Sequence, residues 1–214
     1  MQILRTIQEL KAWRKALNTN DIGFVPTMGA LHNGHASLIQ KAASENSAVI
    51  VSIFVNPKQF LAGEDYTQYP RKEQADLAMA KGCGASACFL PSEDEFYSGD
   101  DTLISAPKEL ASVLEGQIRP GHFDGVCRVL NKFFNLIKPQ RAYFGQKDAQ
   151  QLLIVQKMVK DFFIDIEIKA CQIVREADGL AISSRNAYLN EAELLEALKL
   201  SRALKKAKSL IDLG

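Results

Sequence analysis

Two patterns of apolar residues alternate along the chain. Some segments have apolar residues at the spacing of a helix, and others are short and almost continuously apolar. Residues 22–26 and 48–55 are apolar, and each run is closed or followed by proline, which is typical of buried parallel strands. Residues 34–46 between them have helical spacing. The same criteria predict helices at 3–17, 72–81, 107–114, 124–137 and 148–161, with Asp124 as a possible cap, strands at 87–91, 141–144 and 164–171, and a polar loop at 115–124.

Strands and helices therefore alternate regularly, and this order predicts an α/β fold with a doubly wound parallel sheet. Ligands of such sheets bind beyond the carboxyl ends of the strands. We therefore expect the loops after Val25, Val55 and Phe144 to converge on one site, although they are far apart in the sequence.

The tail has a different character. Asn190 and Glu193 resemble a capping box, and they are followed by apolar residues at spacings of three and four. This pattern predicts one long amphipathic helix whose apolar stripe needs a partner. The stripe consists of Ala197, Leu200, Leu204, Ala207 and Ile211.

Composition narrows the classes of function. The chain has 214 residues with a net charge of +1, so no global basic field favours nucleic acid or an anionic membrane. No apolar run approaches the roughly 20 residues that span a bilayer, and residues 1–15 lack the apolar block of a signal peptide, so we expect a cytoplasmic protein. The four cysteines form no CxxC pair or zinc-like cluster, and we interpret them as reduced, small apolar residues.

Two histidines mark the exit of the first predicted βαβ strand. His32 and His35 flank Gly34 in PTMGALHNGH (26–35), at the expected start of a helix. Imidazoles and free amide groups at a helix N-terminus favour a phosphate, and they can stabilise the charge of a phosphoryl group under attack. The alternatives are histidines that merely cap a turn and a metal site, for which an HxxH pair without a third ligand is weak support.

Other polar residues follow the later strands. Lys147 stands at a helix start, where a cation is unfavourable unless an anion binds, although a solvated lysine is the ordinary interpretation. Ser184 and Arg185 follow a predicted turn, and alone they could be a polar turn. Gln59 and Gln151 can both donate and accept, which suits an acid with hydroxyl groups, although exposed glutamines are common.

Five motifs in order carry a resemblance to a known family. They are PTMGALHNGH (26–35), VSIFVNPKQF (51–60), RPGHFDGV (119–126), YFGQKDAQQ (143–151) and VREADGLAISSRN (174–186). The first resembles the HxGH signature of the Rossmann-like nucleotidylyltransferase superfamily. Together the five closely resemble the pantoate–β-alanine ligase family.

The resemblance implies ATP-dependent condensation of (R)-pantoate with β-alanine through pantoyl adenylate, giving pantothenate, AMP and pyrophosphate. It implies catalytic roles for His35, His32, Lys147 and Arg185, and a homodimer. Gln59, Gln151 and the neighbouring Asn56 are expected to bind pantoate, with Gln59 also facing β-alanine. The ATP contacts it implies are Met28, Gly29, Ala30, Leu31, His32, Asn33, Gly34, His35, Gly145, Gln146, Lys147, Asp148, Val174, Ile182, Ser183, Ser184 and Arg185.

Magnesium is expected to arrive bound to the ATP phosphates, because this ion keeps several waters, so no protein metal site is predicted. Asp76 is a candidate contact for the ion, with a solvated helix acid as the alternative. Residues 119–124 are expected to form part of the pocket wall.

The sequence departs from the family at three points. Gln146 stands where the family ordinarily has Glu, so no carboxylate acts there, and Ile182 replaces Met or Leu. The family also continues beyond the region that matches residues 190–214. We therefore expect a catalytic domain at 1–186 and the start of a truncated C-terminal lid domain at 187–214, with adenylation surviving better than the complete reaction.

The residues alone leave two alternative functions open. One is another HxGH nucleotidyl transferase that activates a different acid, against which the motifs around Gln59 and Gln151 count. The other is a non-catalytic module that binds ATP and uses the stripe from Leu200 to Ile211 for a partner.

Overall fold

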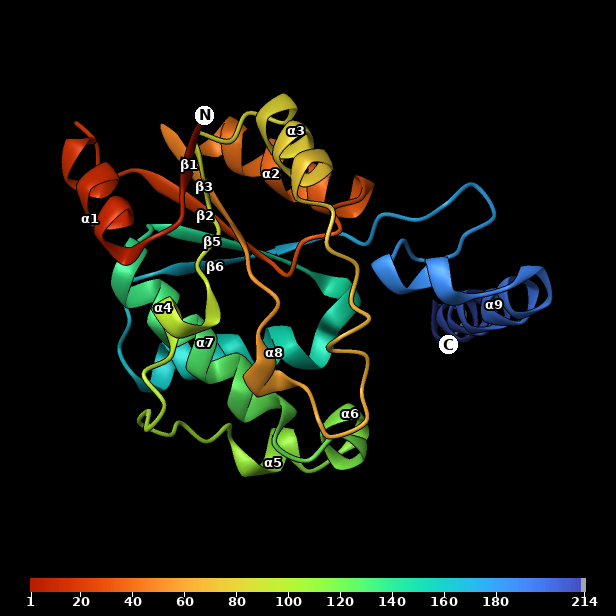
Figure 1. The fold of residues 1–214 in the computed structure, drawn as a ribbon. Helices are drawn as coiled ribbons and strands as arrows, with labels where there is room; N and C mark the ends of the chain where they lie inside the picture. The colour runs from red at the N-terminus through yellow and green to blue at the C-terminus, as the bar shows by residue number, and fades with distance from the viewer. Residues whose placement is uncertain (213–214) are drawn as a thin grey trace.

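The computed structural model describes residues 1–212; Leu213 and Gly214, at the end of the predicted 187–214 domain, lie outside the described residues. The described chain contains a six-stranded sheet in the order β1-β4-β3-β2-β5-β6, and every neighbouring pair is parallel (Figure 1). The strands are β1 (Gln2–Leu4), β2 (Ile22–Thr27), β3 (Ala48–Ile53), β4 (Ala87–Phe89), β5 (Arg141–Gly145) and β6 (Glu167–Cys171).

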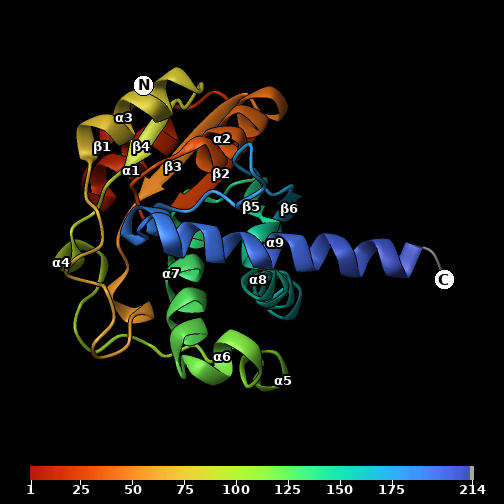
Figure 2. The same ribbon diagram turned by 90° about the vertical axis from the view of Figure 1, so that its right-hand side faces the viewer.

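Helices cover both faces of this sheet, as expected for a doubly wound fold (Figures 1 and 2). The α-helices are α1 (Ile7–Ala16), α2 (Asn33–Glu45), α3 (Glu73–Gly82), α4 (Glu93–Phe96), α5 (Lys108–Ala111), α6 (Leu114–Ile118), α7 (His122–Ile137), α8 (Ala149–Asp161) and α9 (Glu191–Asp212). Helices α2 and α3 pack on one face, whereas α1, α7 and α8 pack on the other. The predicted fold class is thus confirmed. Among residues 1–212 no helix is long and apolar enough to cross a membrane.

Alternation within the strands explains the two layers. Phe24 in β2 and Ile50 in β3 belong to the core beneath α7, whereas Val25 and Val51 belong to the core beneath α2. Because both faces are buried, these strands appear in the sequence as continuous apolar runs.

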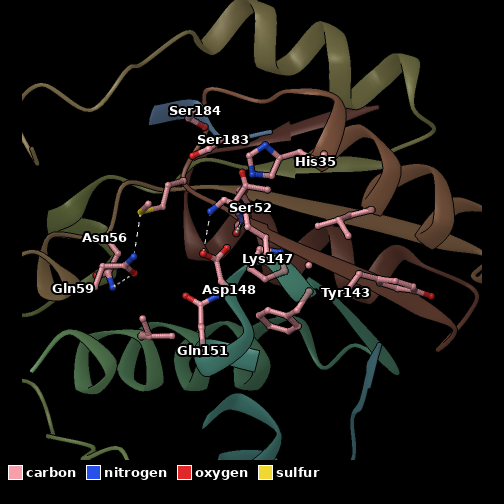
Figure 3. Close-up of a pocket in the computed structure, with 18 of the residues that line it drawn as sticks. His35, Ser52, Asn56, Gln59, Tyr143, Lys147, Asp148, Gln151, Ser183 and Ser184 are labelled. Carbon is pink, nitrogen blue, oxygen red and sulfur yellow. Dashed lines mark hydrogen bonds and ion pairs between the residues drawn. The ribbon is translucent and has the colours of Figure 1, made fainter. Parts of the chain in front are cut away.

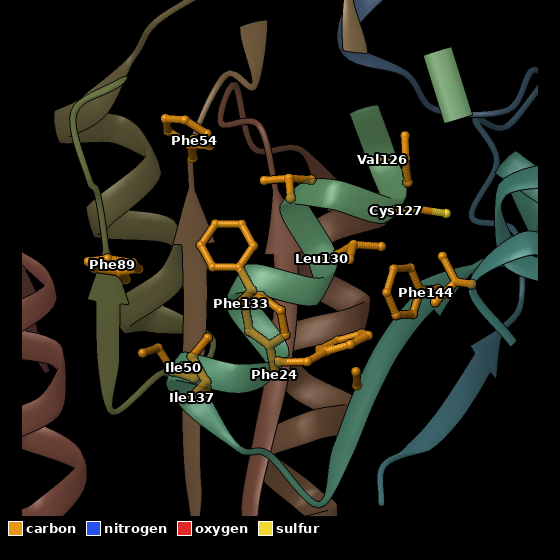
Figure 4. Close-up of a cluster of buried hydrophobic side chains, with 14 of the residues drawn as sticks. Phe24, Ile50, Phe54, Phe89, Val126, Cys127, Leu130, Phe133, Ile137 and Phe144 are labelled. Carbon is orange, nitrogen blue, oxygen red and sulfur yellow. The ribbon is translucent and has the colours of Figure 1, made fainter. Parts of the chain in front are cut away.

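Helix α7 supplies most of the larger core. Its Phe133 ring packs against the ring of Phe24, with the centroids 5.4 Å apart (Figure 4). The Phe133 centroid also lies 4.7 Å from that of Phe96. Trp13 of α1, the only tryptophan of the chain, is buried in the same cluster. This packing anchors the sheet whose carboxyl edge carries the polar loops.

The first and middle segments differ from the prediction. Residues 3–17 are not one helix, because β1 occupies Gln2–Leu4 and α1 begins after Thr6, whose side chain accepts from the Glu9 amide in a capping box. The helix predicted at 107–114 is two short helices, α5 and α6, with Leu114 in a left-handed conformation (φ 48°) at the break. Helix α4 was not predicted.

The loop predicted at 115–124 is also partly helical. Helix α6 reaches Ile118 and α7 begins at His122, so Asp124 does not cap α7. Its carboxylate instead accepts from the Ala106 amide at 2.7 Å and ties α7 to the preceding loop. The strand predicted at 164–171 begins at Glu167, and the strand predicted at 87–91 ends at Phe89.

The predicted tail helix is present as α9, with the expected capping box between Asn190 and Glu193. Its buried residues, Leu198 and Ser201, lie near its middle, and Gly179 packs closely against Ser201 and the end of the Lys205 side chain. The second half projects beyond the rest of the structure (Figure 2). Most of the predicted stripe is exposed, including Leu200, Leu204 and Ile211.

Candidate active site

The loop from β2 to α2 forms one wall of the cavity at the carboxyl edge of the sheet. Thr27 donates its hydroxyl proton to the Ser52 carbonyl at 2.6 Å and accepts from the Gly29 amide at 3.2 Å. The chain then turns through two left-handed residues, Gly29 (φ 85°) and Ala30 (φ 50°). A side chain at Gly29 would be strained and would also crowd Asp76, so glycine is required here.

Asp76 holds this turn from the first turn of α3. Its two carboxylate oxygens accept from the amides of Ala30 and Leu31 at 2.9 and 2.7 Å. The side chain is 2% exposed, so the alternative of a solvated helix acid is wrong. Burial raises the pKa of Asp76, and the two amide bonds oppose that shift because they favour the carboxylate. Both oxygens therefore serve the loop.

The hydrogen bonds of His32 and His35 fix their tautomers. His32 caps α2: its Nδ1 accepts from the Gly34 amide at 3.1 Å, and the Nδ1 of His35 accepts from the His32 amide at 3.3 Å. Amides can only donate, so both Nδ1 atoms lack a proton. In the neutral imidazoles each Nε2 carries the proton and is a donor. A Cβ at Gly34 would approach the His32 ring to 2.9 Å, which explains the glycine in this motif.

Both imidazoles are neutral in the free protein. Burial, followed by the neighbouring His32 and Lys147, lowers the pKa of His35 to about 3. Burial and Lys147 also lower the pKa of His32. The two rings stack with their centroids 4.0 Å apart. The wall thus offers uncharged N–H donors in fixed positions.

Charged residues form the opposite wall. Lys147 lies two residues after the end of β5. It donates to the carboxylate of Asp148 at 3.1 Å, and both side chains are partly exposed. Arg185 makes a two-bond pair with Asp65, with both N···O distances at 2.9 Å. This pair raises the pKa of Arg185, which therefore stays charged. Figure 3 shows Lys147 and Asp148 below Ser183 and Ser184 in the same space as His35.

The two walls touch directly. The Ser184 hydroxyl donates to the Ala30 carbonyl at 3.1 Å, which joins the segment 183–185 to the left-handed turn. Tyr69 lies beneath the Arg185 guanidinium, 5.5 Å from it. Residues more than 100 positions apart therefore enclose one cavity.

Gln59 and Gln151 reach the cavity from its other side (Figure 3). The Nε2 of Gln59 faces the Met28 sulfur at 3.2 Å, and its Oε1 accepts from Asn56 at 2.9 Å. Asn56 lines the cavity but is 1% exposed. The predicted contribution of the loop after Val55 to the site is confirmed.

The sequence profile of the pantoate–β-alanine ligase family matches residues 2–213. The chain belongs to the pantoate–β-alanine ligase family. It is 60% identical to the pantothenate synthetase of Campylobacter fetus over 99% of this chain and 77% of that protein. It is 52% identical to the pantothenate synthetase of Helicobacter pylori over 100% of this chain and 78% of that protein.

Solved structures of this family have the same fold. The pantothenate synthetase of Thermus thermophilus superimposes with a TM-score of 0.96 at 45% identity, covering all of this chain and 77% of that one. The pantoate–β-alanine ligase of Francisella tularensis, solved in complex with β,γ-ATP and β-alanine, gives 0.90 at 44% identity over 96% of this chain and 79% of that one. The resemblance seen in the five motifs is thus confirmed.

In this member of the family, most of the predicted site residues line the cavity. Gly29, Ala30, Leu31 and Asn33 support the loop without lining the cavity, and Gln146 is exposed outside it. The residues that do line it are Met28, His32, Gly34, His35, Asn56, Gln59, Gly145, Lys147, Asp148, Gln151, Val174, Ile182, Ser183, Ser184 and Arg185.

Sequence reasoning missed a partly buried network around Gln59. Arg119 pairs with both carboxylate oxygens of Glu64 at 2.6 Å and donates to the main-chain carbonyl of Gln59 at 3.3 Å. His122 Nδ1 donates to the same carbonyl at 2.7 Å, and its Nε2 faces Arg119 at 3.2 Å. Burial lowers the pKa of His122. The wall expected from residues 119–124 is present, but its partner Glu64 left no signal in the sequence.

Proposed function

We propose that this chain condenses (R)-pantoate with β-alanine at the expense of ATP, and that the cavity between the two walls is where the reaction occurs. One observation carries the proposal: neutral Nε2–H donors of His32 and His35 face the same cavity as the cations Lys147 and Arg185. Fixed donors and cations around one cavity suit phosphoryl chemistry, in which charge develops on oxygens without a protein nucleophile.

In the first step a pantoate carboxylate oxygen attacks the α-phosphorus of ATP. The new P–O bond forms pantoyl adenylate, and the bond to the bridging oxygen breaks, so pyrophosphate leaves with the electron pair. His35 donates its Nε2 proton in a hydrogen bond to a phosphate oxygen, and His32 assists. Lys147 and Arg185 neutralise the charge on the departing pyrophosphate.

In the second step the neutral amine of β-alanine attacks the acyl carbon of pantoyl adenylate. The amide C–N bond forms, the C–O bond to the phosphate breaks so that AMP leaves with that oxygen, and the nitrogen loses one proton to solvent. Gln59 and Gln151 orient pantoate for both steps, with Gln59 also facing β-alanine, and Asn56 supports the pocket. Amides suit this task because they hold hydroxyl and carboxylate groups without adding charge.

The nucleotide is proposed to contact residues 28–35, residues 145–148, Val174 and residues 182–185. Two observations support the loop 28–35: it leads into the N-terminus of α2, where an anion is favoured, and Asp76 and Thr27 hold the preceding turn. For residues 182–185 the support is the bond between Ser184 and Ala30, which brings this segment to that loop.

Magnesium is proposed to bind through the ATP phosphates, where it neutralises their charge when bound. Within residues 1–212 no group of three or more His, Cys, Asp and Glu side chains is arranged to hold an ion. Asp76, the candidate contact, already uses both oxygens on backbone amides. The donor set therefore suits an ion that keeps its waters and phosphate ligands.

We further propose that residues 1–186 form the catalytic domain and residues 187–214 begin a C-terminal domain. The projecting second half of α9 supports this division. The protein is also proposed to act in the cytoplasm as a homodimer. The four cysteines are free thiols, which suits a reducing compartment, and exposed leucines of α9 offer an apolar surface. Sedimentation analysis tests the dimer.

The deciding experiment measures ATP–pyrophosphate exchange with (R)-pantoate, and AMP release with and without β-alanine. We expect pantoate-dependent exchange that His35→Ala lowers by about 10²- to 10³-fold, and AMP release that requires β-alanine. Rapid-quench detection of pantoyl adenylate compares the two half-reactions. Binding of ATP without any response to pantoate would overturn the proposal and direct a screen toward other carboxylic acids.

A further inference from the structure

Asn56 uses its whole amide inside the protein. Its Oδ1 accepts from the Lys58 amide at 3.2 Å and from the Tyr97 hydroxyl at 2.7 Å. Its Nδ2 donates to the Gly125 carbonyl at 3.1 Å and to Gln59 Oε1 at 2.9 Å. A side-chain amide has two donor protons and two acceptor lone pairs. These four bonds use all of them, so Asn56 has no hydrogen-bonding capacity left for a substrate.

The directions of these bonds are fixed by chemistry. A backbone amide can only donate and a carbonyl can only accept, so the atom facing Lys58 is Oδ1 and the atom facing Gly125 is Nδ2. The Asn56 Nδ2 must then meet an acceptor on Gln59, which is Oε1. The Nε2 of Gln59 therefore points the other way, toward Met28 in the cavity. Gln59 presents N–H groups, not its carbonyl, to a ligand.

Tyr97 completes this chain from the far side of Asn56. Its hydroxyl is a donor, because burial raises the pKa of Tyr97 and Oδ1 of Asn56 is an acceptor. The ring is 6% exposed, packs on Phe96 with centroids 5.5 Å apart, and lies under the Lys132 ammonium at 4.6 Å. Tyr97 does not line the cavity, yet it is rigidly held two hydrogen bonds from Gln59.

We infer that Tyr97 is a positioning residue, which acts through Asn56 to hold the Gln59 amide with its N–H groups toward pantoate. The inference rests on the proposed function, because it takes Gln59 as a pantoate contact. It extends that function by assigning polarity: the Gln59 subsite selects an oxygen acceptor of the acid. Gly125 permits the arrangement, since a side chain there would overlap the Lys58 carbonyl.

A double-mutant cycle between Tyr97→Phe and Gln59→Ala tests the inference, with initial rates of pantoate-dependent ATP–pyrophosphate exchange. Tyr97→Phe removes only the hydroxyl. We expect it to raise the KM for pantoate about threefold to tenfold, with kcat and the KM for ATP changed less than about twofold. In the Gln59→Ala background the same change is expected to alter the KM for pantoate less than about 1.5-fold. Tyr66→Phe, whose hydroxyl contacts Glu93 at the surface, is the matched control and is expected to behave as wild type.

Thermal denaturation of each variant sets an assay temperature at which all are folded. An equal effect of Tyr97→Phe in both backgrounds, an equal rise in the KM for ATP, or no effect would each overturn the inference. If Gln59→Ala alone leaves the KM for pantoate unchanged, the assignment of pantoate to Gln59 fails, and the inference fails with it. If Gln59→Ala raises this KM and Tyr97→Phe does not, only the inference fails.

Discussion

The two walls of the active-site cavity are held by different kinds of interaction. The wall with His32 and His35 rests on hydrogen bonds at buried acceptors: the Ser52 carbonyl for Thr27 and the carboxylate of Asp76 for the turn. The wall with Lys147 and Arg185 rests on ion pairs of partly exposed side chains with Asp148 and Asp65.

This difference separates two tasks. Neutral donors held by buried bonds need no rearrangement when charge develops on a phosphate oxygen. The cations already have carboxylate partners, and a phosphate can replace or share those partners because the pairs are open to solvent. One wall is thus suited to transition-state stabilisation, and the other to electrostatic capture of the nucleotide.

The largest expected effect removes a donor from the buried wall. His35→Ala is expected to lower kcat for pantoate-dependent exchange by about 10²- to 10³-fold, the usual effect of losing one such donor. His35→Gln, which keeps an N–H, is expected to lose about tenfold. Ser44→Ala, on the exposed face of the same helix, is the control. Equal losses for Ala and Gln would contradict the role of His35 as a neutral donor.

Lys147→Ala tests the charged wall. We expect kcat/KM for ATP to fall about 100-fold, mainly through KM, and the KM for ATP to lose part of its dependence on salt. Steady-state kinetics from low to high ionic strength measure both. Lys157→Ala, which breaks an exposed pair on α8, is the control. A loss confined to kcat, with unchanged salt dependence, would place Lys147 with the buried wall.

Asp76→Asn weakens the support of the buried wall without touching the cavity. One amide of the turn would then face an NH₂ group, so we expect kcat/KM for ATP to fall about tenfold and unfolding free energy to drop by about 1–3 kcal/mol. Glu73→Gln, in the same helical turn with an exposed pair to Arg5, is expected to cost less than about 1 kcal/mol. Urea denaturation compares the two. Equal losses of unfolding free energy in the two variants would show that the buried carboxylate of Asp76 supports the turn no more than an exposed acid does.

The smallest effect concerns pH and the neutral state of His35. Its pKa, lowered to about 3, lies below the unfolded value of 6.5, so the unfolded chain binds a proton between these values and the folded chain does not. Stability therefore falls as pH decreases through this window. From pH 7.5 to 5.5 we expect His35→Gln to lose about 1 kcal/mol less than wild type. Urea denaturation at both pH values checks this, and parallel losses would mean that His35 is protonated in the folded chain.

The sequence predicted the central part of the fold and most of the cavity lining. Strands β2, β3 and β5 are buried on both faces, so they appear as apolar runs, and their carboxyl ends necessarily share one edge of the sheet. The side chains that follow these ends, such as His35, Gln59 and Lys147, are therefore predictable as neighbours from the sequence alone.

Features that depend on distant partners could not be predicted. Strand β1 has three residues, of which only Leu4 is buried, so it is too short to show an alternating pattern. It is a strand because it pairs with β4. In the sequence Asp76 resembles an ordinary acid at a helix start. Its role in holding the turn depends on its hydrogen bond with the amide of Ala30, 46 residues away. The network of Arg119 and Glu64 has the same origin, 55 residues apart.

The placement of Trp13 gives these comparisons an internal optical reporter. The only indole of the chain is buried beside α7 and does not line the cavity. Its emission will therefore shift to longer wavelength when the core opens to water. Changes confined to the cavity walls leave its surroundings intact. Trp13 fluorescence can thus show that a variant is folded in the same sample in which nucleotide turnover is measured.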